Sequence, residues 1–154
     1  MGSPEFLKNM ARMKVNAMGY YSLNGKSVIS FPENSRWGSI ISFIRKVRKN
    51  NPGKAIIVVL DNLKSHKVEE VKLEAERLGI ELVFLPPYSP DLNPIEYVWK
   101  SIKRIISITF VRHMDDMRNT ITEAFYRLTK RLSFATAWLD KFLAPRFNYT
   151  DFCK

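Results

Sequence analysis

The chain of 154 residues is 45% hydrophobic and carries a formal net charge of +10. A chain of this length builds one complete hydrophobic core and is too short for two comfortable domains. The excess of cations favours a polyanionic partner, and nucleic acid outranks a membrane because no apolar stretch approaches the roughly 20 residues of a bilayer span. A single cysteine, Cys153, excludes an internal disulfide framework and a thiolate zinc site, as expected in a reducing cell interior.

The first predicted elements are two antiparallel strands, within 13–21 and 27–31. The pair Asn24-Gly25 between them is typical of a tight hairpin turn. Apolar side chains at helical spacing then predict a helix that starts near Trp37 and stops at the turn 51–53. Residues 1–7 resemble a cloning scar and lack the apolar centre of a secretion signal, so they are left out of the fold prediction.

A buried parallel strand is predicted for the apolar run 55–60, which shows no alternation and is therefore expected to be covered on both faces. A shorter strand is predicted over 82–85. Amphipathic helices are predicted over 68–78, 117–128 and 134–142. The order of elements predicts an α/β fold with helices packed on a mixed sheet. Asp61 then lies at the carboxyl end of a strand, where open α/β sheets bind ligands.

A further helix is predicted after the proline-rich segment. Asn93 suits its N-terminal cap and Pro94 its first position, and apolar side chains form one stripe along it. Glu96, Lys100 and Lys103 share the other face, at spacings of four and three. A carboxylate and two cations are therefore expected to point the same way.

Asp61 and Glu96 form a candidate metal site. A carboxylate at a strand tip and another at the start of a later helix suit phosphodiester cleavage by two divalent ions, Mg²⁺ or Mn²⁺, about 3.5 to 4 Å apart. Both acids would be metal ligands and catalytic. Lys100, Lys103 and Arg104 are candidate DNA-binding residues, because they are placed to meet a phosphate that the ions hold.

Two motifs resemble the catalytic core of the mariner-related DDE transposases of prokaryotic insertion sequences. They are Leu60-Asp61-Asn62 with His66 close behind, and Leu85-Pro86-Pro87-Tyr88-Ser89-Pro90-Asp91-Leu92-Asn93-Pro94-Ile95-Glu96 followed by Trp99-Lys100. The resemblance implies an RNase H-like fold, an Asp-Asp-Glu triad with two metal ions, cleavage at the ends of a mobile element and joining of a 3′-hydroxyl to target DNA. It also implies a cytoplasmic, nucleoid-associated prokaryotic protein. By position, Asp61 is the second acid and Glu96 the third.

The first acid of that triad has no counterpart here. No Asp precedes Asp61, and the earlier glutamates are Glu5, in the presumed scar, and Glu33, at a helix entrance. The strand that carries the first acid and the family's N-terminal helix-turn-helix are expected to be missing, so this fragment is expected to be inactive or nearly so. Residues 8–112 are interpreted as the truncated catalytic core and 113–154 as its C-terminal helical extension. An exposed sheet edge would favour a homodimer or strand exchange.

Each site residue also has a purely structural interpretation. Asp61 alone would suit the start of a turn, and Glu96 would suit a reciprocal cap with Asn93. Asn62 either orients Asp61 or stabilises the turn, and His66 either braces the loop or contacts substrate. The basic clusters at 45–49, 100–104 and 130–131 are expected to be mostly solvated surface, apart from the candidates Lys100, Lys103 and Arg104.

Three functions remain open on the sequence. The leading one is a DNA transposase catalytic fragment that acts on element ends and target DNA. The alternatives are an RNase H-like endonuclease without strand transfer, and a catalytically dead DNA-binding remnant of a mobile element.

Overall fold

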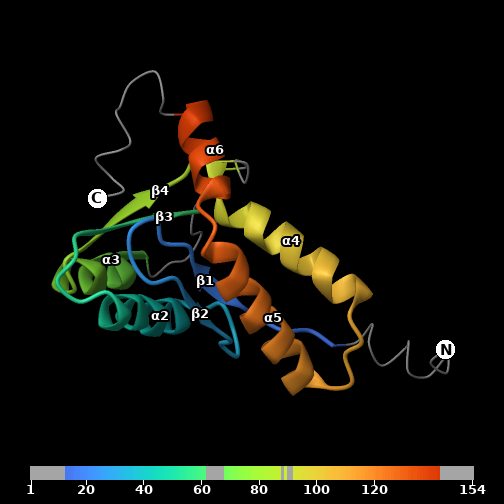
Figure 1. Cartoon of the computed structure of the whole chain (residues 1–154). Helices are drawn as coiled ribbons and strands as arrows, with labels where there is room; N and C mark the ends of the chain where they lie inside the picture. The colour runs from blue at the N-terminus through green and yellow to red at the C-terminus, as the bar shows by residue number, and fades with distance from the viewer. Residues whose placement is uncertain (1–12, 62–67, 88, 90–91, 143–154) are drawn as a thin grey trace.

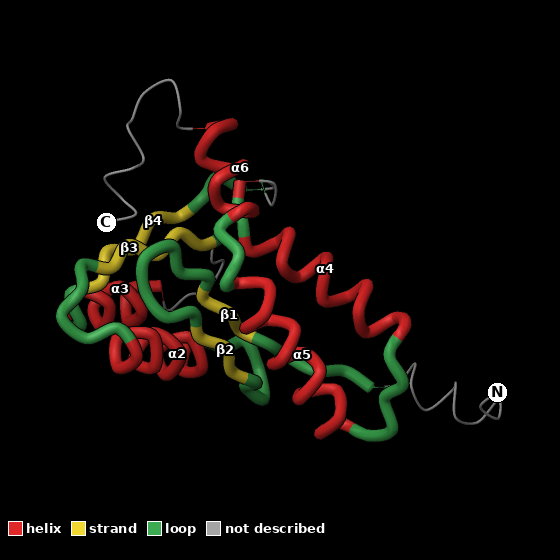
Figure 2. The backbone as a smooth tube through the Cα atoms, viewed as in Figure 1, coloured by secondary structure: helices red, strands yellow, loops and turns green. Residues whose placement is uncertain are grey.

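The structure is a computed structural model that describes residues 13–61, 68–87, 89 and 92–142. Within them, strands β1 (Met18–Tyr20) and β2 (Val28–Ser30) form an antiparallel pair, and strands β3 (Ile56–Leu60) and β4 (Ile80–Phe84) form a parallel pair. Helices flank both pairs (Figures 1 and 2). The predicted mixed α/β architecture is confirmed, but the expected single sheet is divided into two pairs in the described part of the chain.

The predicted hairpin forms with shorter strands than expected, and its turn is held from outside. Asn51 follows the first helix, α2 (Trp37–Asn50), and its side chain is buried. Its amide accepts a hydrogen bond from Lys26 N–H at 2.6 Å and donates one to Lys26 O at 3.0 Å. Inside the turn, Ser22 Oγ accepts from Gly25 N–H at 2.8 Å. The hairpin is therefore fixed to the end of α2.

Arg48 of α2 holds the two turns that lead into the parallel pair. The second helix, α3 (Val68–Arg77), is followed by a turn at Gly79, which has a positive φ of 65°. The Arg48 guanidinium donates to four backbone carbonyls, those of Lys54 at 2.7 Å, Leu78 at 2.8 Å, Gly79 at 2.9 Å and Asn51 at 3.2 Å. One side chain thus connects α2 to the chain entering β3 and to the chain entering β4.

The basic cluster at 45–49 has a structural role that the sequence did not indicate. Arg45 Nε lies 2.7 Å from Glu74 Oε1 on α3, and Lys46 Nζ donates to Ile29 O at 2.7 Å. With Arg48 engaged as well, the cluster is not simply the solvated surface that was expected. Its cations connect α2 to β2, to α3 and to the turns beside them.

A second helical layer is made of α4 (Ile95–Ile108), α5 (Met114–Thr129) and α6 (Ser133–Phe142). Helices α4 and α5 lie side by side, away from α2 and α3 (Figure 1). Trp99 of α4 stacks on Phe125 of α5, with ring centroids 5.7 Å apart. Trp99 is therefore a packing residue rather than a base-stacking platform. None of the helices in the described ranges is long and apolar enough to cross a bilayer.

The two strand pairs are covered differently. Val28 packs with α2 and α3, whereas its neighbour Ile29 packs with α4 and α5, so β2 is covered on both faces. On β3, Ile56 packs with α2 and α3, but Ile57 is 53% exposed and Val59 is 36% exposed. The prediction that this strand is covered on both faces is therefore wrong for the described structure. The apolar run has no alternation in sequence, but its burial alternates because only one helical layer packs against it.

Candidate active site

Asp61 is the first residue after β3, and its side chain is exposed. The pairing of the two parallel strands continues to this end, because Leu85 N–H donates to Leu60 O at 2.8 Å. The chain that leaves β4 for the proline-rich segment therefore starts beside Asp61. This is the position that the sequence predicted, at the carboxyl edge of the parallel pair.

Glu96 lies in the first turn of α4 and is half-buried. Pro94 already has helical dihedral angles, and the Asn93 side chain accepts a hydrogen bond from Ile95 N–H at 3.4 Å. The N-cap is Pro94, one residue after the predicted Asn93, and Asn93 contacts the start of the helix from the position before it. The Glu96 carboxylate makes no hydrogen bond within the described residues, so the reciprocal cap with Asn93 is not formed. Its carboxylate remains available for another role.

Three other predicted residues affect the pKa of Glu96. Burial raises the pKa of Glu96, and the negative charge of Asp61 raises it further. The positive charges of Lys103 and Lys100 act in the opposite direction on the same pKa. Such contributions fall off with distance, so they favour positions of Asp61, Lys100 and Lys103 near Glu96. The assignment of these residues to one site stays a prediction.

The donor set suits part of a divalent-ion site. Two carboxylates whose charges repel each other are the arrangement that a bound hard cation relieves, and both offer the oxygen ligands that Mg²⁺ and Mn²⁺ prefer. In the part of the chain that the structure describes, no third His, Cys, Asp or Glu completes a cluster with them. The pair fits a site to which a further ligand must be added.

The basic residues beside Glu96 line the outer face of α4. Lys100, Lys103 and Arg104 point away from the buried stripe, and among the described residues neither Lys103 nor Arg104 forms an ion pair. The Lys100 ammonium lies 5.7 Å from the centre of the Tyr97 ring. The sequence reasoning missed Tyr97 as a residue of this face; the signal was its position one residue after Glu96, outside the apolar stripe.

Two further candidates, Asn62 and His66, lie outside the described residues. The alternative in which Asp61 only begins a turn depends on the same segment, 62–67, and is likewise outside them.

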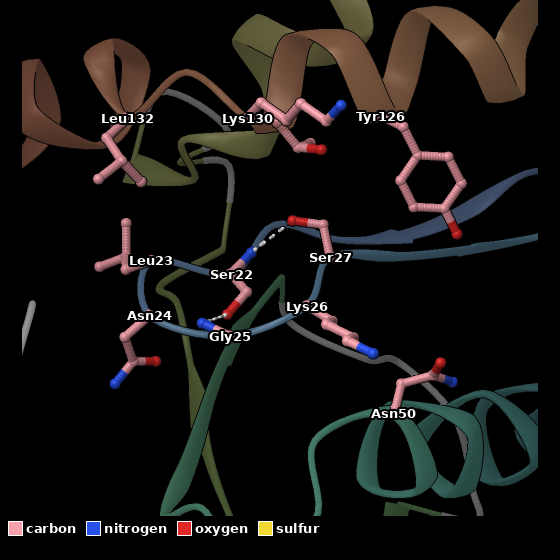
Figure 3. A pocket seen from close by; sticks show the side chains of 11 residues that line it. Ser22, Leu23, Asn24, Gly25, Lys26, Ser27, Asn50, Tyr126, Lys130 and Leu132 are labelled. Carbon is pink, nitrogen blue, oxygen red and sulfur yellow. Dashed lines mark hydrogen bonds between the residues drawn. The ribbon is translucent and has the colours of Figure 1, made fainter.

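A separate hollow of about 510 Å³ lies between the hairpin turn and the end of α5 (Figure 3). It contains none of the candidate site residues. Lys54, just ahead of β3, donates a hydrogen bond to the Asn24 carbonyl in the same turn. The hollow therefore lies at the end of β3 that is opposite to Asp61, and it is not part of the candidate site.

Comparison with known proteins gives a family. The sequence profile described as DDE superfamily endonuclease matches residues 4–118, from within the presumed scar to the first turns of α5. The chain is similar to the Transposable element Tcb2 transposase of Caenorhabditis briggsae, with 33% identity over 61 residues, and to the Transposable element Tc1 transposase of Caenorhabditis elegans, with 29% identity over 75 residues. It is also 36% identical over 56 residues to an uncharacterized protein of Sinorhizobium fredii.

These similarities cover pieces of the proteins concerned. They span 40% and 49% of this chain for the two transposases and 36% for the rhizobial protein. They span 22%, 28% and 39% of the respective relatives. The chain thus covers less than two fifths of each relative's length.

Proposed function

Because the chain belongs to the DDE superfamily endonucleases, we propose that it is the catalytic-domain fragment of a DNA transposase, in which Asp61 and Glu96 are the second and third acids of an Asp-Asp-Glu triad. The observation that carries the proposal is the placement of Asp61 directly after β3, at the carboxyl end of the parallel pair, and of Glu96 in the first turn of α4. The effect of Asp61 and of two lysines on the pKa of Glu96 supports it. The parent protein would cut DNA at the ends of a mobile element and join the freed 3′-hydroxyl to target DNA.

In this proposal the two carboxylates hold divalent metal ions, Mg²⁺ or Mn²⁺. When bound, such ions supply charge stabilisation for the attacking and leaving oxygens of the phosphodiester. Asp61 and Glu96 position these ions from a strand tip and from a rigid helix start. Lys100, Lys103 and Arg104 bind the phosphates of the DNA backbone next to the site, as cations without acidic partners do.

The division of the strands supports the proposal that a strand with the first acid is absent from this chain. Among the described residues, β1 pairs only with β2 and β3 only with β4, so each pair has an edge without a hydrogen-bonded neighbour. Both pairs rest on the α2–α3 layer, through Val28 in one and Ile56 in the other. A strand added beside β3 would bring a carboxylate next to Asp61. Without it the fragment is expected to be inactive, and its free edges favour a homodimer.

The wider assignments belong to the same proposal. Residues 8–112 would form the truncated RNase H-like core and 113–154 its helical extension, with 1–7 as a cloning scar. The parent protein would act on the nucleoid of a prokaryotic cell. The similarity to a rhizobial protein is in keeping with that source.

Metal binding by this chain tests the acid pair directly. Mn²⁺ broadens NMR signals of nearby nuclei, so we expect selective broadening around Asp61 and the first turn of α4 at low Mn²⁺ concentration. Asp61→Asn and Glu96→Gln should each weaken the effect. Glu76→Gln on α3 and Glu123→Gln on α5, which remove exposed carboxylates on other helices, are the matched controls. Broadening that is indifferent to the first two substitutions would refute the assignment.

Strand cleavage and strand transfer are tested with the full-length parent protein, Mg²⁺ and a DNA duplex that carries the element end. We expect nicking and joining, both abolished by Asp61→Asn and by Glu96→Gln while the thermal unfolding curve stays unchanged. Nicking without joining would support an RNase H-like endonuclease instead. DNA binding that is indifferent to metal and to both substitutions, with no cleavage, would support a DNA-binding remnant.

A further inference from the structure

The turn between α4 and α5 presents apolar side chains to solvent at a fixed position. Ile108, the last residue of α4, is 87% exposed, and Phe110 is 63% exposed. Val111, next in the chain, is fully buried in the core and anchors the turn. Thr109 donates from its hydroxyl to Ile105 O at 2.6 Å, which fixes the end of the helix. Exposed apolar side chains on a fixed backbone are typical of a contact surface.

Cations surround these two side chains. The Arg112 guanidinium lies 5.6 Å from the centre of the Phe110 ring, and Arg104 is exposed one helical turn before Ile108. The acids nearby are engaged within the chain. Asp115 pairs with Arg118 at 3.2 Å, and Asp116 accepts from the Arg112 backbone N–H at 3.2 Å and lies 3.5 Å from His113 Nε2. The Asp115 carboxylate is still 78% exposed and that of Asp116 38% exposed, so three arginines, Arg104, Arg112 and Arg118, against two aspartates leave a positive balance around the apolar pair.

Helix α4 connects this turn to the acid pair. Twelve residues separate Glu96 from Ile108, which corresponds to about 18 Å along the helix axis. Figure 1 shows the turn at the end of α4 that is far from β3 and β4. The outer face of the helix between them carries Lys100, Lys103 and Arg104. A DNA duplex held at the acid pair and running along this face would reach the turn after about five base pairs.

We propose that the α4–α5 turn is a second DNA contact, in which Ile108 and Phe110 pack against the sugars and base edges of the minor groove while Arg104 and Arg112 bind the adjacent phosphates. Apolar side chains flanked by arginines are a recurrent means of contacting that groove. DNA fits better than a second copy of the chain, because this surface is cationic and the chain carries +10, so self-association here would bring like charges together. The inference rests on the proposed function, since it takes DNA as the ligand of α4.

The test measures binding of this chain to a fluorescein-labelled DNA duplex by anisotropy over a series of NaCl concentrations. The double variant Ile108→Ser/Phe110→Ser is expected to bind about tenfold more weakly at every salt concentration, with an unchanged salt dependence, because an apolar contact releases no counterions. Arg112→Ala is expected to reduce the slope of log K against log[salt] by about one. Leu73→Ser on α3 is the matched control, because Leu73 is also 63% exposed and lies outside this surface.

Each other outcome overturns a defined part of the argument. If the double variant binds as Leu73→Ser does while Lys103→Ala weakens binding, the contact at the turn is refuted and DNA binding along α4 stands. If the unmodified chain does not bind the duplex at all, both the contact at the turn and DNA binding along α4 are refuted. If the double variant changes the sedimentation coefficient of the free chain and leaves the DNA affinity unchanged, the turn contacts a second copy instead. Circular dichroism melting establishes that all variants are folded.

Discussion

Helices cover the two strand pairs of this protein differently, and the hydrophobicity of the strands suggests the opposite order of burial. The β3 segment is an unbroken apolar run, but Ile57 in its middle is 53% exposed. The β2 segment is only three residues long, but Val28 and Ile29 bury both of its faces between two helical layers. Coverage therefore depends on which helices the chain places next to a strand, and hydrophobicity alone does not determine it.

The less covered pair is also the one that carries the candidate site. Asp61 follows β3 directly, and the β3 edge has no hydrogen-bonded neighbour within the described residues. The hairpin pair, by contrast, is held by hydrogen bonds from Asn51 at its turn, and its strand β1 packs closely against Trp99 at Gly19. The hairpin pair is thus held in place by its contacts, whereas the parallel pair is open to a ligand or to a further strand. Four substitution experiments follow from this difference.

The largest effect should distinguish two isoleucines, one in each pair. Ile29→Ala removes a side chain that is 4% exposed between β2 and the α4–α5 layer, and should lower the free energy of unfolding by about 2–5 kcal/mol. Ile57→Ala removes an exposed side chain and should change it by no more than about 0.5 kcal/mol. Urea denaturation monitored by tryptophan fluorescence measures both. Equal losses would mean that the outer face of β3 is covered.

The next effect concerns two glycines. A methyl group at Gly19 would lie 2.7 Å from Trp99 Cζ2 and 2.8 Å from Phe125 Cε2, so Gly19→Ala should destabilise the protein by about 1–3 kcal/mol. Gly38 lies in the first turn of α2 with no atom within 4 Å of such a group. Gly38→Ala should therefore stabilise by about 0.4–1 kcal/mol. Thermal unfolding checks the opposite signs, and a neutral Gly19→Ala would show that the covered pair is loosely packed.

Local signals predicted most of the secondary structure. The Asn24-Gly25 pair predicted the hairpin, although residues 21–27 join its strands in place of a tight two-residue turn. Apolar periodicity predicted every helix of the described residues to within a few positions. These features depend on neighbouring residues in the sequence, so they are readable there. The coverage of β3 was predicted wrongly because it depends on which helices reach it, and that information is not local.

The candidate site was predictable in a similar, partial way. The positions of Asp61 at a strand end and Glu96 at a helix start follow from the order of elements. Their grouping in one metal site stays a prediction. The role of Arg48 was not predictable, because a run of cations does not show that four backbone carbonyls lie within reach of one of them. The exposed apolar pair at the α4–α5 turn was missed because it interrupts the helical periodicity rather than continuing it.

A smaller effect concerns the single layer that covers the parallel pair. Hydrogen bonds from Arg77 and Arg45 lower the pKa of Glu74 from its ordinary 4.5 to about 2. A carboxyl whose pKa is lowered on folding stabilises the folded state fully above pH 4.5 and loses that contribution as the pH falls toward 2. Glu74→Gln should therefore lower stability at neutral pH and flatten the stability profile between these pH values. Urea denaturation across this pH range measures the free energy of unfolding, and Glu123→Gln, at an exposed position, is the control. Parallel profiles for Glu74→Gln and the unmodified protein would show that the α2–α3 contact is not ionic.

The smallest effect is a shift in one titration at the open end of β3. The Asp61 carboxylate raises the pKa of Glu96, so Asp61→Asn should lower that pKa, and Lys103→Met should raise it because a compensating positive charge is lost. NMR titration of the ¹³C-labelled Glu96 carboxyl group measures both shifts, and Glu76→Gln on α3 should leave the Glu96 pKa unchanged. Because the Asp61 side chain is exposed, the shift caused by Asp61→Asn should become smaller as NaCl is added. If Asp61→Asn leaves the Glu96 pKa unchanged, the two carboxylates do not interact. The argument that the less covered strand pair carries an active site then fails.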